Sequence, residues 1–289
     1  MRLIRYTNAE LKTRGINHRV GTFRYKDLGE GLPGTPGNFY LRMVWSGEDF
    51  FSPRHLHNFD QVRVQIEGEF DFAGDGSMKP GDIGYFPEGT PYGPQTSQKH
   101  TVQLVLQIGG PSGSGYISQA QRVDAVESLS RTGQFSDGRY FAGGGTGSTG
   151  IDGFQAAWEE ALGRKMVYPP RRFQKPVLMD PEALAWEALP GQPGVDRRQL
   201  WRFGRQAVAA DLYRAAPGAA LALAGPATCF VKRGAGHVQA GSDGHDESPG
   251  SAFESFDVVH IEQGESVTLR PREATQLLVF RHPLFAAGP

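Results

Sequence analysis

The chain has 289 residues and a formal net charge of −1 at pH 7, a length that suits one large domain or two of ordinary size. Its basic residues do not gather into runs and no apolar run reaches membrane-spanning length, so we expect neither a nucleic-acid nor a membrane partner. The opening MRLIRYTNAELKTRG lacks a signal-peptide core, and the lone Cys229 cannot form an internal disulfide, which together predict a cytoplasmic protein.

The first part of the chain predicts short strands between turns. Residues 1–38 are polar and are expected to be an irregular lead-in, ending in the turn-rich GEGLPGTPGN. Strand-like runs follow between 39 and 108: FYLRMVW, QVRVQIEGEFDF, IGYF and TVQLVLQI. Short strands at this spacing favour an antiparallel sandwich or small barrel over βαβ units.

Residues 116–167 differ in character and predict a connector. Ser118 is a suitable N-cap for a helix that stops near Gly133, and GFQAAWEEALGRK predicts a second helix after the glycine-rich loop FAGGGTGSTGIDG. The β pattern then resumes, with GSDGHDESPG as a polar hairpin tip. We therefore expect an N-terminal barrel with its lead-in at 1–115, a connector at 116–167 and a C-terminal barrel at 168–289.

The two β halves have the same order of elements and can be laid over each other. Matching Gly68 to Gly234 brings Asp82 onto Asp257 and Gly89 onto Gly264 once the hairpin of the second half, which its polar insert makes nine residues longer, is allowed for, although identity is low. A repeat of this length indicates duplicated domains rather than a solenoid.

Two motifs in the first half resemble those of the cupin family. Its first motif has the form G-x5-H-x-H-x3-E-x6-G, and the second has the form G-x5-P-x-G-x2-H-x3-N. The first is matched by His55, His57, Gln61 and Gly68, with Asp49 at the leading glycine, and the second by Gly81, Pro87 and Gly89, with Tyr92 and Thr96 at the His and Asn positions. The duplicated pattern resembles a bicupin.

This resemblance implies an all-β fold of two cupin-type antiparallel jelly-roll barrels joined by a short, partly helical connector. It implies a ligand pocket in the barrel lumen. The family includes dioxygenases, decarboxylases, lyases, isomerases, storage proteins and sugar-binding regulators, so the fold alone does not fix the activity.

The equivalent positions in the second half are all apolar. The two histidine positions become Leu221 and Leu223, the Gln61 position becomes Ala227, and the Tyr92 position becomes Val267. We expect this second lumen to be filled with side chains and to hold no metal.

One strand of the first half has a polar face. His55, His57, Gln61, Arg63 and Gln65 share one parity, while Val62, Val64 and Ile66 share the other. Either the polar face meets water or it lines the lumen, and the motif spacing favours the lumen. A buried Arg63 would then need an anion, from a protein carboxylate or from a substrate, which makes Arg63 and Gln65 candidate substrate-binding residues.

The candidate metal ligands are His55, His57, Gln61 and Tyr92, with His100 as a further candidate. Such a set could hold one divalent ion in the N-terminal barrel: Fe, Mn, Ni or Zn. Two neutral imidazoles bind weakly alone, and Gln61 replaces the family's charged Glu with a neutral amide.

Three functions remain open at this stage. The leading hypothesis is a bicupin that acts on a small, anionic organic molecule as a metal-dependent oxygenase or lyase. The alternative is a metal-free isomerase or cyclase in which a histidine, His57 or His55, accepts a proton and Tyr92 returns one. The third is a non-catalytic small-molecule binder. The apolar face of 62–66 could pack between the barrels or in a homodimer.

Overall fold

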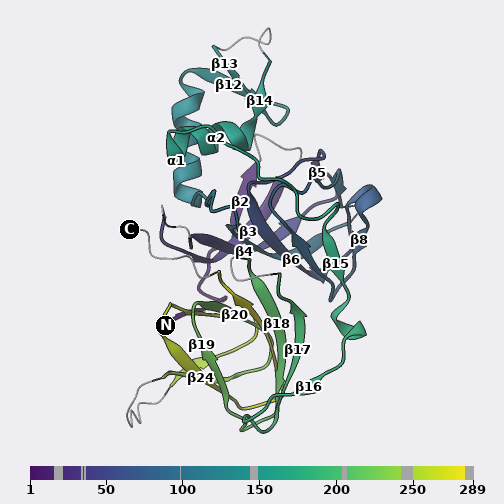
Figure 1. Cartoon of the computed structure of the whole chain (residues 1–289), viewed down its shortest axis with the longest axis vertical. Helices are drawn as coiled ribbons and strands as arrows, with labels where there is room; N and C mark the ends of the chain where they lie inside the picture. Colours follow the sequence, from purple (N-terminus) through teal and green to yellow (C-terminus); the bar gives the residue numbers. More distant parts are fainter. Residues whose placement is uncertain are drawn as a thin grey trace. The chain divides into compact units, whose positions relative to one another are not determined.

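A computed structural model of the chain describes residues 1–15, 22–33, 35, 37–97, 99–143, 149–203, 207–241 and 250–283. It divides into two compact units (Figure 1). The first unit is Leu11–Met179, and the second combines Met1–Glu10 with Asp180–Pro289. The predicted hairpin tip lies almost wholly at 242–249, outside the described residues, as does the part of the glycine-rich loop at 144–148.

The first unit contains a seven-stranded and a four-stranded antiparallel sheet. The large sheet runs in the order β15 (Val177–Met179), β9 (Ile83–Phe86), β6 (Phe59–Glu67), β11 (Thr101–Gly109), β4 (Phe39–Ser46), β3 (Thr22–Glu30), β2 (Lys12–Gly15). The small sheet runs β5 (Phe51–Ser52), β10 (Gln95–Thr96), β7 (Phe70–Asp71), β8 (Ser77–Met78), with a 3₁₀ turn at Ala73–Asp75.

The second unit repeats this arrangement. Its large sheet runs β1 (Arg2–Ile4), β23 (Val258–Ile261), β20 (Ala227–Arg233), β25 (Thr275–Arg281), β18 (Ala209–Ala215), β17 (Val195–Trp201), β16 (Glu187–Ala188). Its small sheet runs β19 (Leu221–Ala224), β24 (Ser266–Pro271), β21 (Gly236–Ala240), β22 (Ser251–Phe253), and a 3₁₀ turn lies at Pro181–Ala183. The predicted all-β fold and its internal repeat are therefore confirmed.

The repeat extends to single contacts. Asp82 accepts a hydrogen bond from the backbone N–H of Lys79, and Asp257 accepts one from that of Glu254, three residues earlier in each case. Both carboxylates thus close the turn before the Asp-led strand.

The connector belongs to the first unit. Helix α1 (Gln119–Ser130) starts at Ser118, which forms a reciprocal capping box with Gln121. Helix α2 (Gly153–Leu162) is capped by Asp152 and ends at the left-handed Gly163. Beside the helices lie three short strands that the sequence did not predict: β12 (Gly133–Ser136), β13 (Arg139–Ala142) and β14 (Ile151–Asp152) (Figure 1).

The lead-in is not irregular, contrary to the sequence-based expectation. It contributes β1, β2 and β3, and in β3 Phe23 and Tyr25 are buried while Arg24 is exposed. The alternation was missed because the outward positions are charged and the apolar ones are few. Residues 168–179 do not open the second barrel, since β15 pairs with β9 in the first unit.

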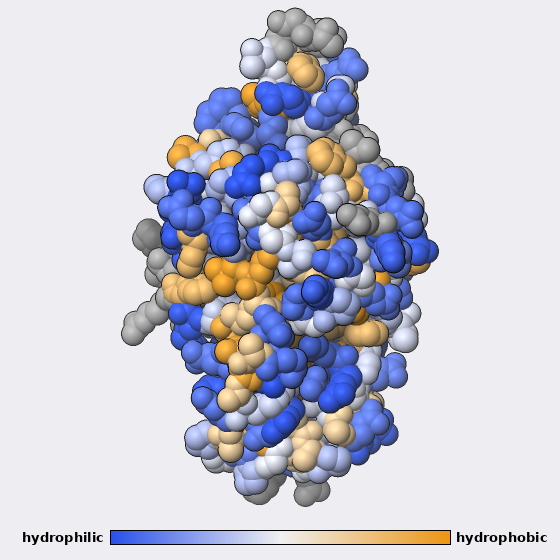
Figure 2. All heavy atoms as spheres, turned by 90° about the vertical axis from the view of Figure 1, so that its right-hand side faces the viewer, coloured by the Kyte–Doolittle hydropathy of each residue, from blue (hydrophilic) through white to orange (hydrophobic). Residues whose placement is uncertain are grey.

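The second barrel has an apolar interior. The four positions that match the ligand positions of the first half, Leu221, Leu223, Ala227 and Val267, are 0–3% exposed and share one hydrophobic cluster. In the described ranges no helix is both long and apolar enough to cross a bilayer. The face drawn in Figure 2 mixes hydrophilic and hydrophobic residues.

Candidate functional site

The first barrel contains a cavity of about 140 Å³. The large sheet lines it with alternate residues of β6, β11 and β4, and α1, α2 and β12 contribute further wall. The residues that line it include Phe23, Arg42, His55, His57, Phe59, Gln61, Arg63, Gln95, Gln103, Val105, Gln107, Arg122 and Phe154. The polar face of 55–63 therefore points into the lumen, as the motif spacing indicated.

The backbone fixes the tautomer of His55. Its Nδ1 lies 2.6 Å from the carbonyl oxygen of Pro53, and a carbonyl can only accept, so Nδ1 carries the hydrogen. In the neutral ring the Nε2 lone pair then faces the Tyr92 hydroxyl at 3.2 Å and the Gln95 amide at 3.3 Å. A backbone bridge between His55 and Tyr92 holds the two side chains opposite each other. His55 is thus oriented as a hydrogen-bond acceptor toward Tyr92.

The Tyr92 hydroxyl is where the motif side chains converge. Besides His55, it lies 3.1 Å from the Gln61 amide nitrogen, 3.4 Å from Arg63 Nη2 and 3.5 Å from His57 Nδ1. Turning the Gln61 amide so that its oxygen faces this cluster lets the oxygen accept from Tyr92, and from Arg63 Nη2 and Nε at 3.0 and 2.8 Å. The Gln61 nitrogen then faces the Gln107 amide nitrogen at 2.8 Å, so the Gln107 amide has to turn with it to keep the hydrogen bond between the two side chains. The Tyr92 proton consequently has two acceptors, Gln61 and His55.

Tyr92 itself is 1% exposed and packs with aromatic rings rather than lining the cavity. The predicted catalytic tyrosine therefore lies next to the two histidines, but on their side away from the cavity. His57 does line the cavity, and its ring stacks on Phe59 with a centroid distance of 4.3 Å and an interplanar angle of 11°. Phe154 of α2 meets the His57 ring edge-on at 6.2 Å.

The cavity wall is rich in cations. Arg42, Arg63 and Arg122 line it together with the two histidines, and none of the described lining residues is Asp or Glu. Arg63 lies among four rings, with its guanidinium carbon 5.0–5.7 Å from the centroids of Phe70, Phe72, Phe86 and Tyr92. Such a wall favours a small anion.

Other predicted site residues lie elsewhere. Gln65 is buried, but its amide donates to the backbone oxygens of Glu67 and Gly68 at 2.7 and 3.1 Å, so it supports the turn instead of lining the cavity. His100 is exposed before β11, outside the cavity wall. Arg42, Gln103 and Gln107 also line the cavity but were not predicted as site residues. Their alternate positions along β4 and β11 are visible in the sequence, but they belong to no motif.

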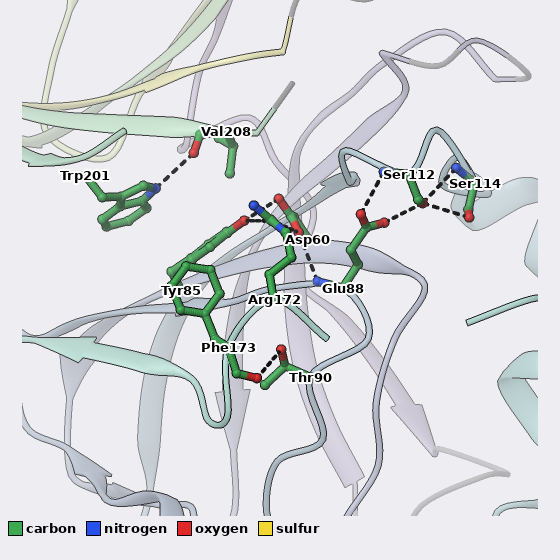
Figure 3. Close-up of polar contacts among 10 residues, drawn as sticks. All are labelled: Asp60, Tyr85, Glu88, Thr90, Ser112, Ser114, Arg172, Phe173, Trp201 and Val208. Carbon is green, nitrogen blue, oxygen red and sulfur yellow. Dashed lines mark hydrogen bonds and ion pairs between the residues drawn. The ribbon is translucent and has the colours of Figure 1, made fainter. Parts of the chain in front are cut away.

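The opposite face of β6 carries a separate polar cluster (Figure 3). Asp60 accepts from the Tyr85 hydroxyl at 2.6 Å and from the Glu88 backbone N–H at 2.9 Å, and Arg172 donates to Tyr85 at 2.7 Å. Burial raises the pKa of Asp60 to about 6 and raises that of Glu88, whose carboxylate accepts from Ser112. This cluster ties Arg172 and the segment before β15 to the barrel.

The donor set at Tyr92 does not fit a divalent cation. It offers two neutral imidazoles, a neutral amide and a phenol, and the Arg63 guanidinium lies 3.4 Å from the phenol oxygen on which the set converges. A positive charge at that distance opposes an ion there. Within the described ranges, no three His, Cys, Asp or Glu side chains are grouped so that they could hold a metal.

The fold resembles solved structures along nearly its whole length. A putative dioxygenase from Nostoc punctiforme matches with a TM-score of 0.61 and 10% identity over 100% of this chain and 87% of its own. HEPD from Streptomyces albus, solved with 2-hydroxyethylphosphonate and Fe(II) bound, matches at 0.57 and 15% identity over 99% and 79%. Oxalate decarboxylase from Lactobacillus farciminis, a formate complex, matches at 0.57 and 12% identity over 98% and 87%.

These likenesses establish a bicupin fold for the chain. No protein-family model matches the sequence, and no curated protein does. At identities this low the similarity concerns the fold, and the activity has to be argued from the site itself.

Proposed function

We propose that the first barrel binds a small organic anion and transfers a proton on it without a metal, as an isomerase or lyase would. The observation that carries this proposal is the wall of three guanidinium groups and two imidazoles around a cavity of about 140 Å³, with no carboxylate among its described lining residues. Cations near a carbonyl or carboxylate stabilise the enolate-like charge that forms when a neighbouring C–H loses its proton.

His57 supplies the base and the acid, and His55 exchanges protons with it. His55 and His57 both line the cavity, and the Tyr92 hydroxyl lies 3.2 Å from one ring and 3.5 Å from the other. His57 takes a proton from one atom of the bound molecule and returns a proton to another, while Tyr92 passes protons between His57 and the Nε2 of His55. Tyr92 is thus a positioning residue, because it does not touch the cavity.

Proton transfer can be tested before the natural substrate is known. A panel of three- to six-carbon 2-oxo and 2-hydroxy carboxylates is incubated with the protein in D₂O, and deuterium incorporation is followed by NMR. We expect exchange on at least one ligand, slowed about 100-fold or more by His57→Gln and roughly 10-fold or more by Tyr92→Phe. Tyr140→Phe removes a hydroxyl outside the cavity and is the matched control.

Two outcomes would contradict the proposal in different ways. Ligands that bind but never exchange would leave a non-catalytic binder, and a complete absence of anion binding would remove the proposal as a whole.

The metal-dependent oxygenase or lyase is tested by elemental analysis of untagged protein. Stoichiometric Fe, Mn, Ni or Zn that disappears in a His55→Ala/His57→Ala variant would establish a metal centre.

A further inference from the structure

Three neighbouring strands present one row of side chains to the cavity. Arg63 on β6 is paired directly with Val105 on β11, and Val105 is paired directly with Arg42 on β4. All three line the cavity. Because adjacent strands lie about 4.8 Å apart, the Cα atoms of the two arginines are roughly 10 Å apart, with an isopropyl group between them.

On each side of these three residues, a pair of glutamine side chains is hydrogen-bonded between β11 and β6. Gln107 and Gln61, directly paired on β11 and β6, are joined by a side-chain hydrogen bond of 2.8 Å, and Gln103 is joined to Gln65 by one of 2.7 Å. These cross-strand bonds fix the lumen wall above and below the arginine row. The two arginines therefore extend from a rigid sheet with a set backbone spacing.

The two arginines have different surroundings. Arg63 contacts Gln61 and Tyr92 and lies among four aromatic rings, which fixes its position. Arg42 lies over the rings of Phe23 and Tyr40 at 5.6 and 5.1 Å, and its buried Nε has no hydrogen-bond partner. A buried guanidinium N–H without an acceptor costs free energy, which a ligand oxygen would recover.

We infer that the ligand is a dianion with two separated charged ends, such as a dicarboxylate of about four to six carbons, which spans Val105 from Arg63 to Arg42. One end lies at Arg63 beside the histidines, and the other end accepts from Arg42. The Val105 side chain contacts the apolar middle of the ligand. This inference rests on the proposed function and narrows its substrate class.

Calorimetry with matched ligands tests this length and charge requirement. Dicarboxylates from oxalate to pimelate are compared with monocarboxylates of the same carbon number, using wild type, Arg42→Gln and Arg42→Lys. We expect a four- to six-carbon dicarboxylate to bind at least about tenfold more tightly than its monocarboxylate partner and than oxalate. Arg42→Gln should abolish that preference, and Arg42→Lys should retain part of it. Val105→Phe, which fills the floor of the row, should weaken the preferred dicarboxylate most.

The control is Arg131→Gln, which removes a cation from the C-cap of α1, outside the cavity. Circular dichroism and thermal melting confirm that each variant is folded. Equal affinity for mono- and dicarboxylates, or a preference unchanged in Arg42→Gln, would overturn the inference and leave the proposed function standing if proton exchange persists. If no carboxylate binds the wild type, the proposed function fails together with the inference.

Discussion

At the scale of single residues, Asp60 illustrates how burial sets a pH dependence. Its carboxylate is fully buried, and its partners do not replace the water it has lost, so its pKa rises from 3.8 to about 6. Because the folded-state pKa lies above the unfolded one, the protonated form favours folding. The stabilisation is complete below about pH 3.8 and is lost as the pH rises through about 6.

Asp60→Asn should remove this titration. We expect the free energy of unfolding of the wild type to fall, relative to that of Asp60→Asn, by up to roughly 3 kcal/mol between pH 4 and pH 7. Urea unfolding at several pH values measures the difference, with the exposed Asp124→Asn on α1 as the control. A wild-type-to-variant difference that stays constant over this pH range would contradict the assignment to Asp60.

At the scale of elements, the turn after β6 requires glycine. Gly68 has a φ of +69°, and a Cβ there would lie 2.5 Å from the His100 carbonyl oxygen at the start of β11. Gly234, its partner in the repeat, has a φ of +106° and would meet Thr275 at the start of β25. Both barrels thus have a glycine where the end of one long strand packs closely against the start of the neighbouring strand.

The cost of that close approach can be separated from the cost of the backbone conformation. Gly81 also has a positive φ, +101°, but a Cβ there would meet nothing within 4 Å. Gly68→Ala should therefore destabilise the protein by about 1–3 kcal/mol more than Gly81→Ala, since only the former adds a steric clash. Equal shifts in denaturation midpoint would show that conformation alone makes glycine necessary.

The elements also show which parts of the structure the sequence could predict. The strands of both barrels and the repeat anchored at Gly68 were predictable, because apolar alternation and turn glycines are local signals. Strand β3 was not, because only Phe23 and Tyr25 mark its alternation. The strands β12–β14 were not, because two to four residues are too few to show a period.

Within the site, the convergence of His55, His57 and Gln61 on Tyr92 followed from motif spacing. Arg42 did not, because its role depends on the pairing of β4 with β11, a contact between strands far apart in the sequence. The sequence also could not show that Gln65 does not line the cavity. That outcome depends on the following turn, whose backbone oxygens accept hydrogen bonds from the Gln65 amide.

At the scale of the whole molecule, each barrel is completed by a strand from the segment that precedes the other barrel. β15 comes immediately before the second unit in sequence and pairs at the edge of the first, while β1 precedes the first unit and pairs at the equivalent edge of the second. The exchange explains why the sequence, divided at simple boundaries, does not reproduce the compact units. Each added strand pairs with backbone groups of β9 or β23 that would otherwise lie at the sheet edge.

The second unit should therefore depend on the first residues of the chain. Arg5 donates to the carboxylate of Asp257 at 3.0 Å, and the Tyr6 backbone N–H donates to the same carboxylate at 2.9 Å. Asp257 is fully buried while Arg5 is partly exposed, so Arg5→Ala leaves a buried charge with one donor fewer and should cost about 1–3 kcal/mol.

Hydrogen exchange read strand by strand locates this loss. We expect faster exchange in β23 and β20 of Arg5→Ala, with β6 and β11 unchanged, because the broken contact stabilises only the second unit. Arg2→Ala is the control: the Arg2–Glu262 pair is exposed, at 3.7 Å, and its loss should change exchange little. Equally faster exchange in both units would mean that Arg5 stabilises the whole molecule and not the second unit alone.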